Sequence, residues 1–517
     1  MSRTGRLAQA IDRPFDAILF GLPPALWVFL LVQAIAWIVP PMLLNRAPEL
    51  QTAEIAMWGR DWFWVNDRHP ALSSWVLETA YALFGVHIWV TYFVSQLFTC
   101  ATSIFVFLLG RDLLGTSRSL TGTMLLAGIS FFTISTLKFN HDIAQMPFWA
   151  AFCFALWRAS QSNRAIWWCV TALAAALALY AKFSSLLLIA AGCAWILYDA
   201  RTRSHLRKAA LYIGLVLFCL LLVPLARQSA QLDFMPFETM EQVSAEKGVS
   251  TLAFLLGMVE VVFGLAALAY LGGFIARLPG EPKAGEPKAG EPTPAAVEER
   301  APDRRQLAYL LLLGVGPLAV TIALSCFVRL RTEWTAPMFN LIGLLLIAWR
   351  VPTPIPAGRI RHLAELAVIL SLTTVAAYGG WSLYSRYNIA EPTRVAWPMA
   401  DISRRFDAIW IGKTGEPLRI VGGDHWAAAL AGLPNPAAPS LFTNMDRQLA
   451  PAVTPERVAQ DGVLVVWRVD GGWQPPKTVL AGHVTGIEVF DWSPSSDSRP
   501  IEIGYAIIPP RALTARR

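Results

Sequence analysis

Residues 45–80, NRAPELQTAEIAMWGRDWFWVNDRHPALSSWVLETA, form the one long polar interruption near the start of a very apolar chain. The stretch holds the acids Glu49, Glu54 and Asp61, four tryptophans, and the cluster NDRHP at 66–70. A plain connector between two membrane helices would be shorter and less aromatic. We therefore interpret this stretch as an active-site loop that lies on one face of a membrane, although its tryptophans could also form an interfacial aromatic belt.

The rest of the chain has the composition of a membrane protein. Of its 517 residues, 55% are hydrophobic and only 15% are charged, whereas soluble domains carry about 25% charged residues. Apolar runs of about 20 residues, the length that a bilayer-spanning helix needs, recur along the first three quarters. Lys and Arg in cytoplasmic loops explain the net charge of +7. We therefore expect membrane lipids as partners, and no nucleic acid.

These apolar runs predict a bundle of about eleven transmembrane helices. The predicted spans are 24–44, 87–110, 119–137, 143–157, 165–181, 183–198, 209–225, 251–276, 307–328, 336–349 and 363–384. Basic residues follow every second span, which predicts a multi-pass protein with its N-terminus in the cytoplasm. On this topology the first loop, the turn at 138–142, Lys182 and the turn at 329–334 share the outer face.

The chain divides into two predicted domains. Residues 1–389 form the transmembrane domain, which includes the outer loop at 45–86 and a cytoplasmic linker at 279–304. The linker repeats EPKAG, and its density of proline and charge predicts disorder. Residues 390–517 carry strand-like runs at 418–421, 463–468 and 501–508, separated by turn signals. We therefore predict a mostly α fold with a small periplasmic α/β domain at its C-terminus.

The predicted outer face carries groups that a transfer reaction needs. A carboxylate can deprotonate an acceptor hydroxyl, and a cation can stabilise a phosphate leaving group. Arg329 and Arg331 suit phosphate because a guanidinium pairs bidentately with phosphate oxygens. Each group also has a structural interpretation. Lys182 and Arg331 could be snorkelling anchors, and Asp142 could be the N-cap of a helix.

Four segments give the chain a resemblance to a known family. They are AEIAMWGRD at 53–61, HPAL at 69–72 followed by Trp75, FNHD at 139–142 leading into PFW at 147–149, and AKFSS at 181–185. In this order and spacing they resemble the GT-C superfamily of polytopic glycosyltransferases. The resemblance is to the family 39-like bacterial branch, which is related to protein mannosyltransferases and to the lipid A aminoarabinose transferase.

This resemblance implies inverting transfer of a sugar from a polyprenyl-phosphate donor in a bacterial inner membrane. The acceptor would be a lipid, a lipopolysaccharide or another glycan. An acid of the first loop, Glu54 or Glu49, would act as the base, and Asp142 would be a second catalytic acid. The substrate-binding residues that we expect beside them are Asp67, His69, Asn140, His141, Lys182, Arg329 and Arg331. Lys182 and Arg331 would lie near the donor phosphate.

Two positions depart from the family pattern. Gln51 stands where many relatives have an aspartate, and Ala71 replaces the second proline of the family's Lys/His-Pro-Pro-Leu segment. The first departure leaves Glu49 and Glu54 competing for the role of base, and it leaves open that the chain has drifted from catalysis. Metal dependence also stays open, since these acids could act with or without a divalent cation.

Two other classes of function compete with an enzyme. A transporter or flippase for a lipid-linked glycan would be expected to place ionisable residues inside its spans, near the membrane midplane. Glu260 and Glu365 are the main candidates for such residues, whereas the other charges collect at one face. That distribution favours surface chemistry over passage. An assembly scaffold whose outer domain binds a partner is the third interpretation.

Overall fold

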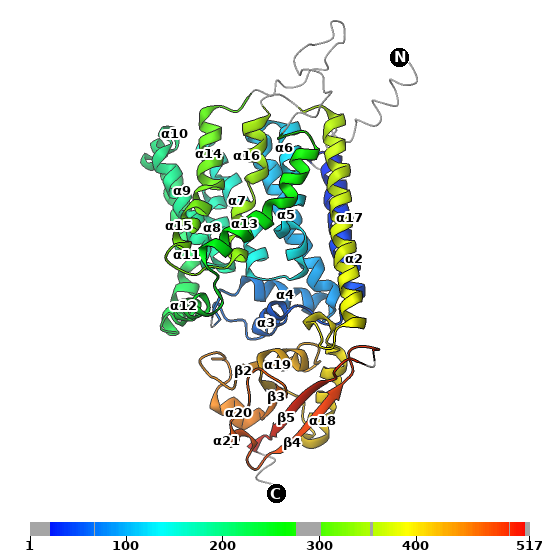
Figure 1. Ribbon diagram of the computed structural model, residues 1–517. Helices are drawn as coiled ribbons and strands as arrows, with labels where there is room; N and C mark the ends of the chain where they lie inside the picture. Colours follow the sequence, from blue (N-terminus) through cyan, green and yellow to red (C-terminus); the bar gives the residue numbers. More distant parts are fainter. Residues whose placement is uncertain (1–20, 67, 276–300, 352–354, 496, 512–517) are drawn as a thin grey trace.

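The computed structural model has a bundle of helices at one end and a small unit of sheet and helices at the other (Figure 1). The structure describes residues 21–66, 68–275, 301–351, 355–495 and 497–511. The predicted cytoplasmic N-terminus lies outside these residues. Of the predicted disordered linker, only the last few residues lie within them.

Six helical stretches among the described residues are long and apolar enough to cross a membrane. They are α2 (Pro24–Leu44), α5 (Ile88–Leu114), α11 (Ala209–Gln231), α13 (Thr251–Leu271), α14 (Arg304–Gly314) with α15 (Gly316–Ser325), and α17 (Ala357–Asn388). Two bent pairs of helices raise the count to eight if each pair is one span. The multi-pass helical fold is therefore confirmed. The predicted number of eleven spans is not, although helical residues occupy every predicted span.

The other helices of the bundle are shorter or broken. They are α6 (Thr116–Met124), η1 (Leu125–Gly128), η2 (Ser130–Phe132), η3 (Ile134–Leu137), α7 (His141–Ser162), α8 (Ala165–Ala181), η4 (Phe183–Ser185), α9 (Leu186–Tyr198), α10 (Ala200–Arg203), η5 (Ser204–Arg207), α12 (Met235–Lys247), η6 (Thr332–Phe339) and α16 (Ile342–Arg350). The predicted span at 183–198 continues into α10 and η5 through a bend of 87°.

The predicted span at 119–137 is not one straight helix. It bends by 90° between Thr116–Gly128 and Ser130–Leu137. At this break the backbone of α13 lies against the chain: a Cβ on Gly128 would be 2.3 Å from the nitrogen of Leu265, and a Cβ on Gly264 would be 2.6 Å from the oxygen of Gly128. Two glycines allow this approach because neither has a side chain. The break therefore depends on a contact with a distant part of the chain.

The first loop contains two helices. α3 (Leu50–Gly59) is the first helix after α2, and α4 (Leu72–Phe84) precedes α5. Both lie at the end of the bundle that faces the C-terminal unit (Figure 1). We refer to this end of the bundle as the site end.

The C-terminal unit is built around a five-stranded sheet in the order β2-β1-β3-β5-β4. β1 runs parallel to β2 and β3, whereas β5 pairs antiparallel with β3 and β4. Its elements are η7 (Arg394–Ala396), α18 (Met399–Thr414), β1 (Ile420–Gly423), α19 (His425–Gly432), β2 (Ser440–Thr443), α20 (Pro455–Asp461), β3 (Val463–Arg468), α21 (Lys477–Leu480), β4 (Val484–Phe490) and β5 (Ile501–Ile508). The predicted C-terminal α/β architecture is confirmed.

The C-terminal unit holds the end of α3. Met57 of α3 and Trp426 of α19 belong to one cluster of buried side chains that continues into the bundle. The guanidinium of Arg60 donates to the carbonyls of Gly432, at 3.3 Å, and Leu433, at 2.7 Å. The carboxylate of Asp61 accepts a hydrogen bond from the hydroxyl of Ser440 at 2.7 Å. One apolar core and a set of polar contacts therefore join the two parts of the molecule.

Candidate active site

The short helix α3 carries the first acid of the site into the interior. Glu54 is buried, and its carboxylate forms an ion pair with the guanidinium of Arg68. That guanidinium also lies 5.2 Å from the ring centroid of Trp58, in a cation–π contact. Every residue from Thr52 to Gly59 is buried. Packing on all sides, rather than one apolar stripe, therefore stabilises this helix.

The start of α7 brings a second acid to the same region. Asn140 is the N-cap, and its side-chain oxygen accepts from the backbone N–H groups of Asp142 and Ile143, both at 3.1 Å. Because Asn140 caps the helix, the Asp142 carboxylate is not the N-cap. It forms a buried ion pair with the ammonium group of Lys182 instead. Asp142 is therefore held as a charged group within the site.

Lys182 faces inward from the end of α8. The residue is 3% exposed, and its ammonium nitrogen lies 5.3 Å from the ring centroid of Trp334. A snorkelling lysine keeps its charged end in water or among headgroups. The geometry of Lys182 is the opposite, since both its carboxylate partner Asp142 and the tryptophan ring are inside the protein. Lys182 is therefore not a surface anchor.

Two hydrogen bonds connect α3 to the start of α7. The side-chain amide of Asn140 donates to the side-chain oxygen of Gln51 at 2.9 Å. The hydroxyl of Thr52 donates to the carbonyl of Phe139 at 3.0 Å. Gln51 is the residue that stands where relatives often carry an aspartate. Its position in this network shows that the departure from the family pattern lies inside the candidate site.

Two histidine rings contact each other beside the ion pairs. The ring centroids of His69 and His141 are 3.9 Å apart, and Nδ1 of His141 shares a hydrogen bond of 2.6 Å with the hydroxyl of Ser73. Burial lowers the pKa of His69 well below its usual value, and His141, Lys182 and Arg68 lower that pKa further. His69 is therefore neutral at pH 7, so it can exchange hydrogen bonds with a substrate but adds no positive charge.

The turn that begins η6 closes another side of the site. Arg331 pairs with Glu333 at 3.0 Å. Glu333 lines a small cavity together with Lys138, Asn140 and Asp142. It also lines a neighbouring open cavity of about 340 Å³, together with Arg331 and Lys247. The Arg331–Glu333 pair therefore stands between the ion pair of Asp142 and a space large enough to admit part of a ligand.

The charge of Glu333 is set by its neighbours. Burial alone would raise the pKa of this carboxyl group, but a backbone hydrogen bond and the guanidinium of Arg331 outweigh it, and Lys138 adds to their effect. The net result is a pKa below the usual value, so Glu333 is ionised at neutral pH.

Two of the residues predicted for the site, Glu49 and Arg329, are not part of this cluster. Glu49 lies at the start of α3, close enough to the phenols of Tyr92 and Tyr378 for its charge to affect them. Arg329 has an exposed side chain, and its backbone carbonyl accepts a hydrogen bond from Ser244. Asp67 lies outside the described residues. The cluster gathers the other seven: Glu54, His69, Asn140, His141, Asp142, Lys182 and Arg331.

Several residues of the cluster could not be singled out in the sequence. Arg68 directly precedes the recognised His69-Pro70 segment, so its proximity was the only available signal. Ser73 and Trp334 meet the cluster through the fold, one from α4 and the other from η6. Glu333 stands in the turn at 329–334, where the two arginines were the residues predicted to bind phosphate. Polar residues that pair across distant elements leave no periodic pattern in the sequence.

The described part of the chain holds no ready set of metal ligands. No group of three or more His, Cys, Asp or Glu side chains is arranged there to hold a metal ion. Asp142 and Glu333 are the two acids that line the small cavity, and each is paired with a cation of the protein. The negative charge that a metal ion would neutralise is therefore already balanced in this arrangement.

Comparisons with known proteins support the fold. Residues 68–226 match the family model described as dolichyl-phosphate-mannose-protein mannosyltransferase. The structure resembles ArnT from Cupriavidus metallidurans bound to undecaprenyl phosphate, with a TM-score of 0.63 and 13% sequence identity over 92% of this chain and 97% of ArnT. ArnT from the same organism in the apo state gives a TM-score of 0.61 and 14% identity, over the same shares of both chains.

No curated protein matches the sequence. The matched residues begin at Arg68 and continue through Asp142 and Lys182, so they contain most of the candidate site. The fold of ArnT extends over nearly the whole chain, including the C-terminal unit. The chain therefore shares the fold of ArnT, and residues 68–226 resemble the dolichyl-phosphate-mannose-protein mannosyltransferases.

Proposed function

We propose that this protein is a membrane glycosyltransferase that moves a sugar from a polyprenyl-phosphate donor to a lipid, lipopolysaccharide or other glycan acceptor. The observation that carries the proposal is a single constellation at the site end. There the ion pairs Asp142–Lys182 and Glu54–Arg68 lie beside the contacting rings of His69 and His141. The chain shares its fold with ArnT, and one of the two ArnT structures described above holds undecaprenyl phosphate. That ligand supports the class of donor.

The proposed reaction is an inverting displacement. An acceptor oxygen attacks the anomeric carbon on the face opposite the phosphate, and a new C–O bond forms there. The bond between that carbon and the phosphate oxygen breaks, and the lipid phosphate leaves with the electron pair. A carboxylate takes the proton of the acceptor hydroxyl. Lys182 and Arg331 stabilise the negative charge that grows on the departing phosphate.

Within this scheme we assign the role of base to Glu54 rather than Glu49. Glu54 belongs to the cluster through Arg68, whereas Glu49 lies beside Tyr92 and Tyr378. In the structure the Glu54 carboxylate is occupied by its ion pair with Arg68. The donor phosphate would compete for Arg68, because arginine pairs bidentately with phosphate. Arrival of the donor would then release Glu54 to act as a base.

Asp142 has a binding role in this scheme. Its carboxylate is oriented by Lys182 and by the side-chain amide of Asn140, which lies 3.3 Å from its second oxygen. A fixed carboxylate of this kind can accept hydrogen bonds from sugar or acceptor hydroxyls. In the proposed orientation the N-terminus is cytoplasmic, and residues 390–517 form a periplasmic domain next to the site.

Conservative variants of the two acids test this assignment. Glu54→Gln and Glu49→Gln, singly and together, are assayed for sugar transfer in membranes, with the exposed Glu416→Gln as the matched control. Loss of a general base lowers rates by about 10²–10⁴-fold, so we expect that loss in Glu54→Gln and near-normal transfer in Glu49→Gln and the control. Normal transfer by Glu54→Gln would show that the base is wrongly assigned.

A further inference from the structure

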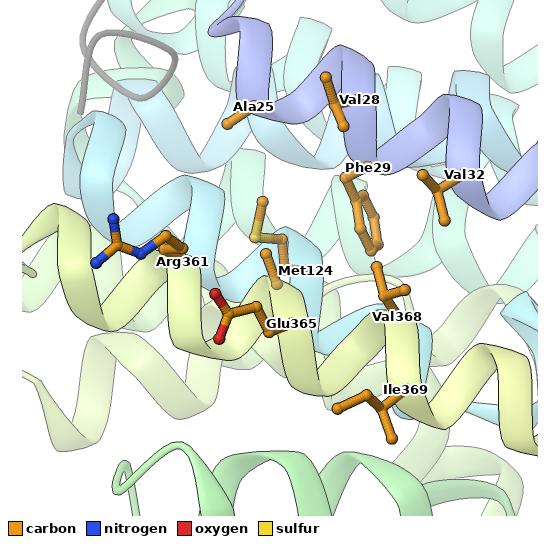
Figure 2. Close-up of a pocket in the computed structure, with 10 residues that line it drawn as sticks. Ala25, Val28, Phe29, Val32, Met124, Arg361, Glu365, Val368 and Ile369 are labelled. Carbon is orange, nitrogen blue, oxygen red and sulfur yellow. The ribbon is translucent and has the colours of Figure 1, made fainter. Parts of the chain in front are cut away.

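A groove on the surface of the bundle lies at the end opposite the candidate active site. Its volume is about 660 Å³, within the range of about 300–1,000 Å³ typical of small-molecule sites. α2 and α17 form its walls, and Met124 of α6 contributes to its floor (Figure 2). Both wall helices begin at the end of the bundle that is farthest from the C-terminal unit (Figure 1). The groove is therefore separate from the proposed sugar-transfer site.

The walls are two facing helical stripes. On α2, Ala25, Phe29 and Val32 recur at the spacing of one helix face. On α17 the stripe runs through Arg361, Glu365 and further apolar residues one turn beyond. Phe29 and Met124 are buried, whereas Val28 and Ile369 on the rims are 60% and 58% exposed. A buried apolar floor between exposed apolar rims has the shape that an acyl chain requires.

Two opposite charges stand at the mouth of this groove. Arg361 and Glu365 are one helical turn apart in the first turns of α17, where Cβ atoms lie about 5–6 Å from each other. Both side chains lean toward the start of the helix (Figure 2). α2 is about 30 Å long at 1.5 Å per residue, which matches the hydrocarbon thickness of a bilayer. Its first turn, which faces Arg361, therefore marks the level of the lipid headgroups.

Glu365 is the group that requires explanation. Its side chain is 62% exposed. Its carboxylate lies 4.0 Å from Nδ1 of His362, which is charged only when protonated. A carboxylate that faces lipid at this depth is expensive unless a cation lies beside it. One turn nearer the headgroups, the same groove carries the guanidinium of Arg361, which can bind an anion. Together these charges are complementary to a ligand that carries both an anion and a cation.

We propose that this groove binds a phospholipid whose headgroup carries a phosphate and a primary ammonium group, as in phosphatidylethanolamine. The phosphate pairs with Arg361, and the ammonium donates hydrogen bonds to Glu365. One acyl chain lies along Phe29 and Val368 above Met124. A headgroup with phosphate but no cation would leave Glu365 unpaired. A quaternary ammonium would neutralise Glu365 but has no N–H to donate, so it would bind less tightly.

The test uses the purified full-length protein and an equal mixture of phosphatidylethanolamine, phosphatidylcholine and phosphatidylglycerol in detergent. Native mass spectrometry then measures which lipid stays bound. We expect the ethanolamine lipid to be retained about tenfold better than either of the others, the factor that one charge-assisted hydrogen bond contributes. Glu365→Gln should remove this preference, whereas Arg361→Ala should weaken retention of all three lipids, because each carries a phosphate. Both side chains are exposed, so these variants should fold normally.

Matched controls remove one charge of the same sign elsewhere on the bundle. The controls are Arg304→Ala and Glu260→Gln. Arg304 lies at the exposed start of α14, and Glu260 is exposed on α13. Both should keep the preference of the wild-type protein. Equal retention of the three lipids by the wild type would overturn the proposal. So would an unchanged preference in Glu365→Gln, or unchanged retention of the three lipids by Arg361→Ala. Neither outcome would bear on sugar transfer at the other end.

Discussion

At the scale of single residues, the candidate site is a set of charges balanced inside the protein. The side chains of Lys182 and Asp142 are 4% and 11% exposed, so neither charge is well solvated. Such a pair adds little net stability compared with apolar side chains, but removal of one partner leaves a buried charge uncompensated. Loss of either partner should therefore lower the free energy of unfolding, and this loss can be measured.

A double-mutant cycle measures that coupling. Asp142→Asn and Lys182→Met should each lower the free energy of unfolding by about 3–5 kcal/mol, because each leaves one unpaired buried charge. The double variant should be more stable than the sum of the single losses predicts. Thermal unfolding in detergent gives the comparison. The same cycle on the solvent-exposed pair Arg499–Glu391 is the control and should show little coupling. Additive losses at Asp142 and Lys182 would contradict the buried pair.

The neutral state of His69 predicts a dependence of stability on pH. In the unfolded chain a histidine binds its proton near pH 6.5, whereas the pKa of folded His69 is well below its usual value. As the pH falls below about 6.5, the unfolded state therefore binds more protons and the folded state loses stability. His69→Gln removes this contribution, so its melting temperature should fall less between pH 7 and pH 5. The exposed His87→Gln is the control. Parallel curves for His69→Gln and the wild type would contradict a neutral His69.

At the scale of elements, α3 connects the candidate site to the C-terminal unit. One side of α3 meets the start of α7 through Gln51 and Thr52. Its far end meets α19 and β2 through Arg60 and Asp61. Glu54 lies between these two sets of contacts. The position of the proposed base is therefore fixed from both sides, and one of those sides is the C-terminal unit.

Arg60 is the residue through which this connection can be tested. Arg60→Met removes the donors to the carbonyls of Gly432 and Leu433, so α3 should lose part of its attachment to α19. We expect kcat for sugar transfer to fall about tenfold or more while KM for the donor changes little, because misplacement of a catalytic group acts on the transition state. The exposed Arg447→Met is the control. A rise in KM with kcat unchanged would show that Arg60 does not position the base.

The sequence predicted elements well where an apolar run alone decides the structure. The spans at 24–44 and 165–181 coincide with α2 and α8. Prediction failed where a distant contact decides. The break at Gly128 requires the backbone of α13, and α3 is helical because eight of its residues are buried on all sides. β2, with only four residues, is defined by its pairing with β1.

The same limit applies to the site. Asp142, Lys182 and His69 were found because they stand in recognisable segments of the sequence, and the fold brings them together. Which charge pairs with which could not be predicted, because Arg68 and Glu54 meet only when the loop folds back onto α3. Sequence separation carries no information about such a pairing.

At the scale of the whole molecule, one core joins a bundle and a sheet, and two candidate binding sites lie at opposite ends. The transporter interpretation expects ionisable residues along an interior path. Glu260 and Glu365, the two candidates for such residues, are both exposed on the outer surfaces of α13 and α17. Buried ion pairs lie at both ends of the bundle, Glu54–Arg68 and Asp142–Lys182 at the site end and Asp199–Arg305 at the other. Neither of the two candidate residues therefore lies on an interior path, which disfavours a transporter.

The proposed orientation places the site end and the C-terminal unit in the periplasm. A cysteine introduced at Lys413, which is exposed on α18, should react in intact cells with a thiol reagent that cannot cross the inner membrane. A cysteine at Arg304, at the exposed start of α14 on the opposite end, should react only after the cells are lysed. The reverse pattern of labelling would contradict the proposed orientation and would place the site on the cytoplasmic face.

The central claim is that the cluster around Asp142 and Lys182 transfers a sugar from a lipid-phosphate donor. Mass spectrometry of glycolipids from a deletion strain tests it most directly, with the wild-type gene or Asp142→Asn returned to the strain. We expect the deletion strain to contain a glycan that lacks one sugar and an accumulated polyprenyl-phosphate sugar. Wild type should restore both to normal, and Asp142→Asn, expressed at the same level, should not. Unchanged glycans and donor in the deletion strain, or full restoration by Asp142→Asn, would contradict it.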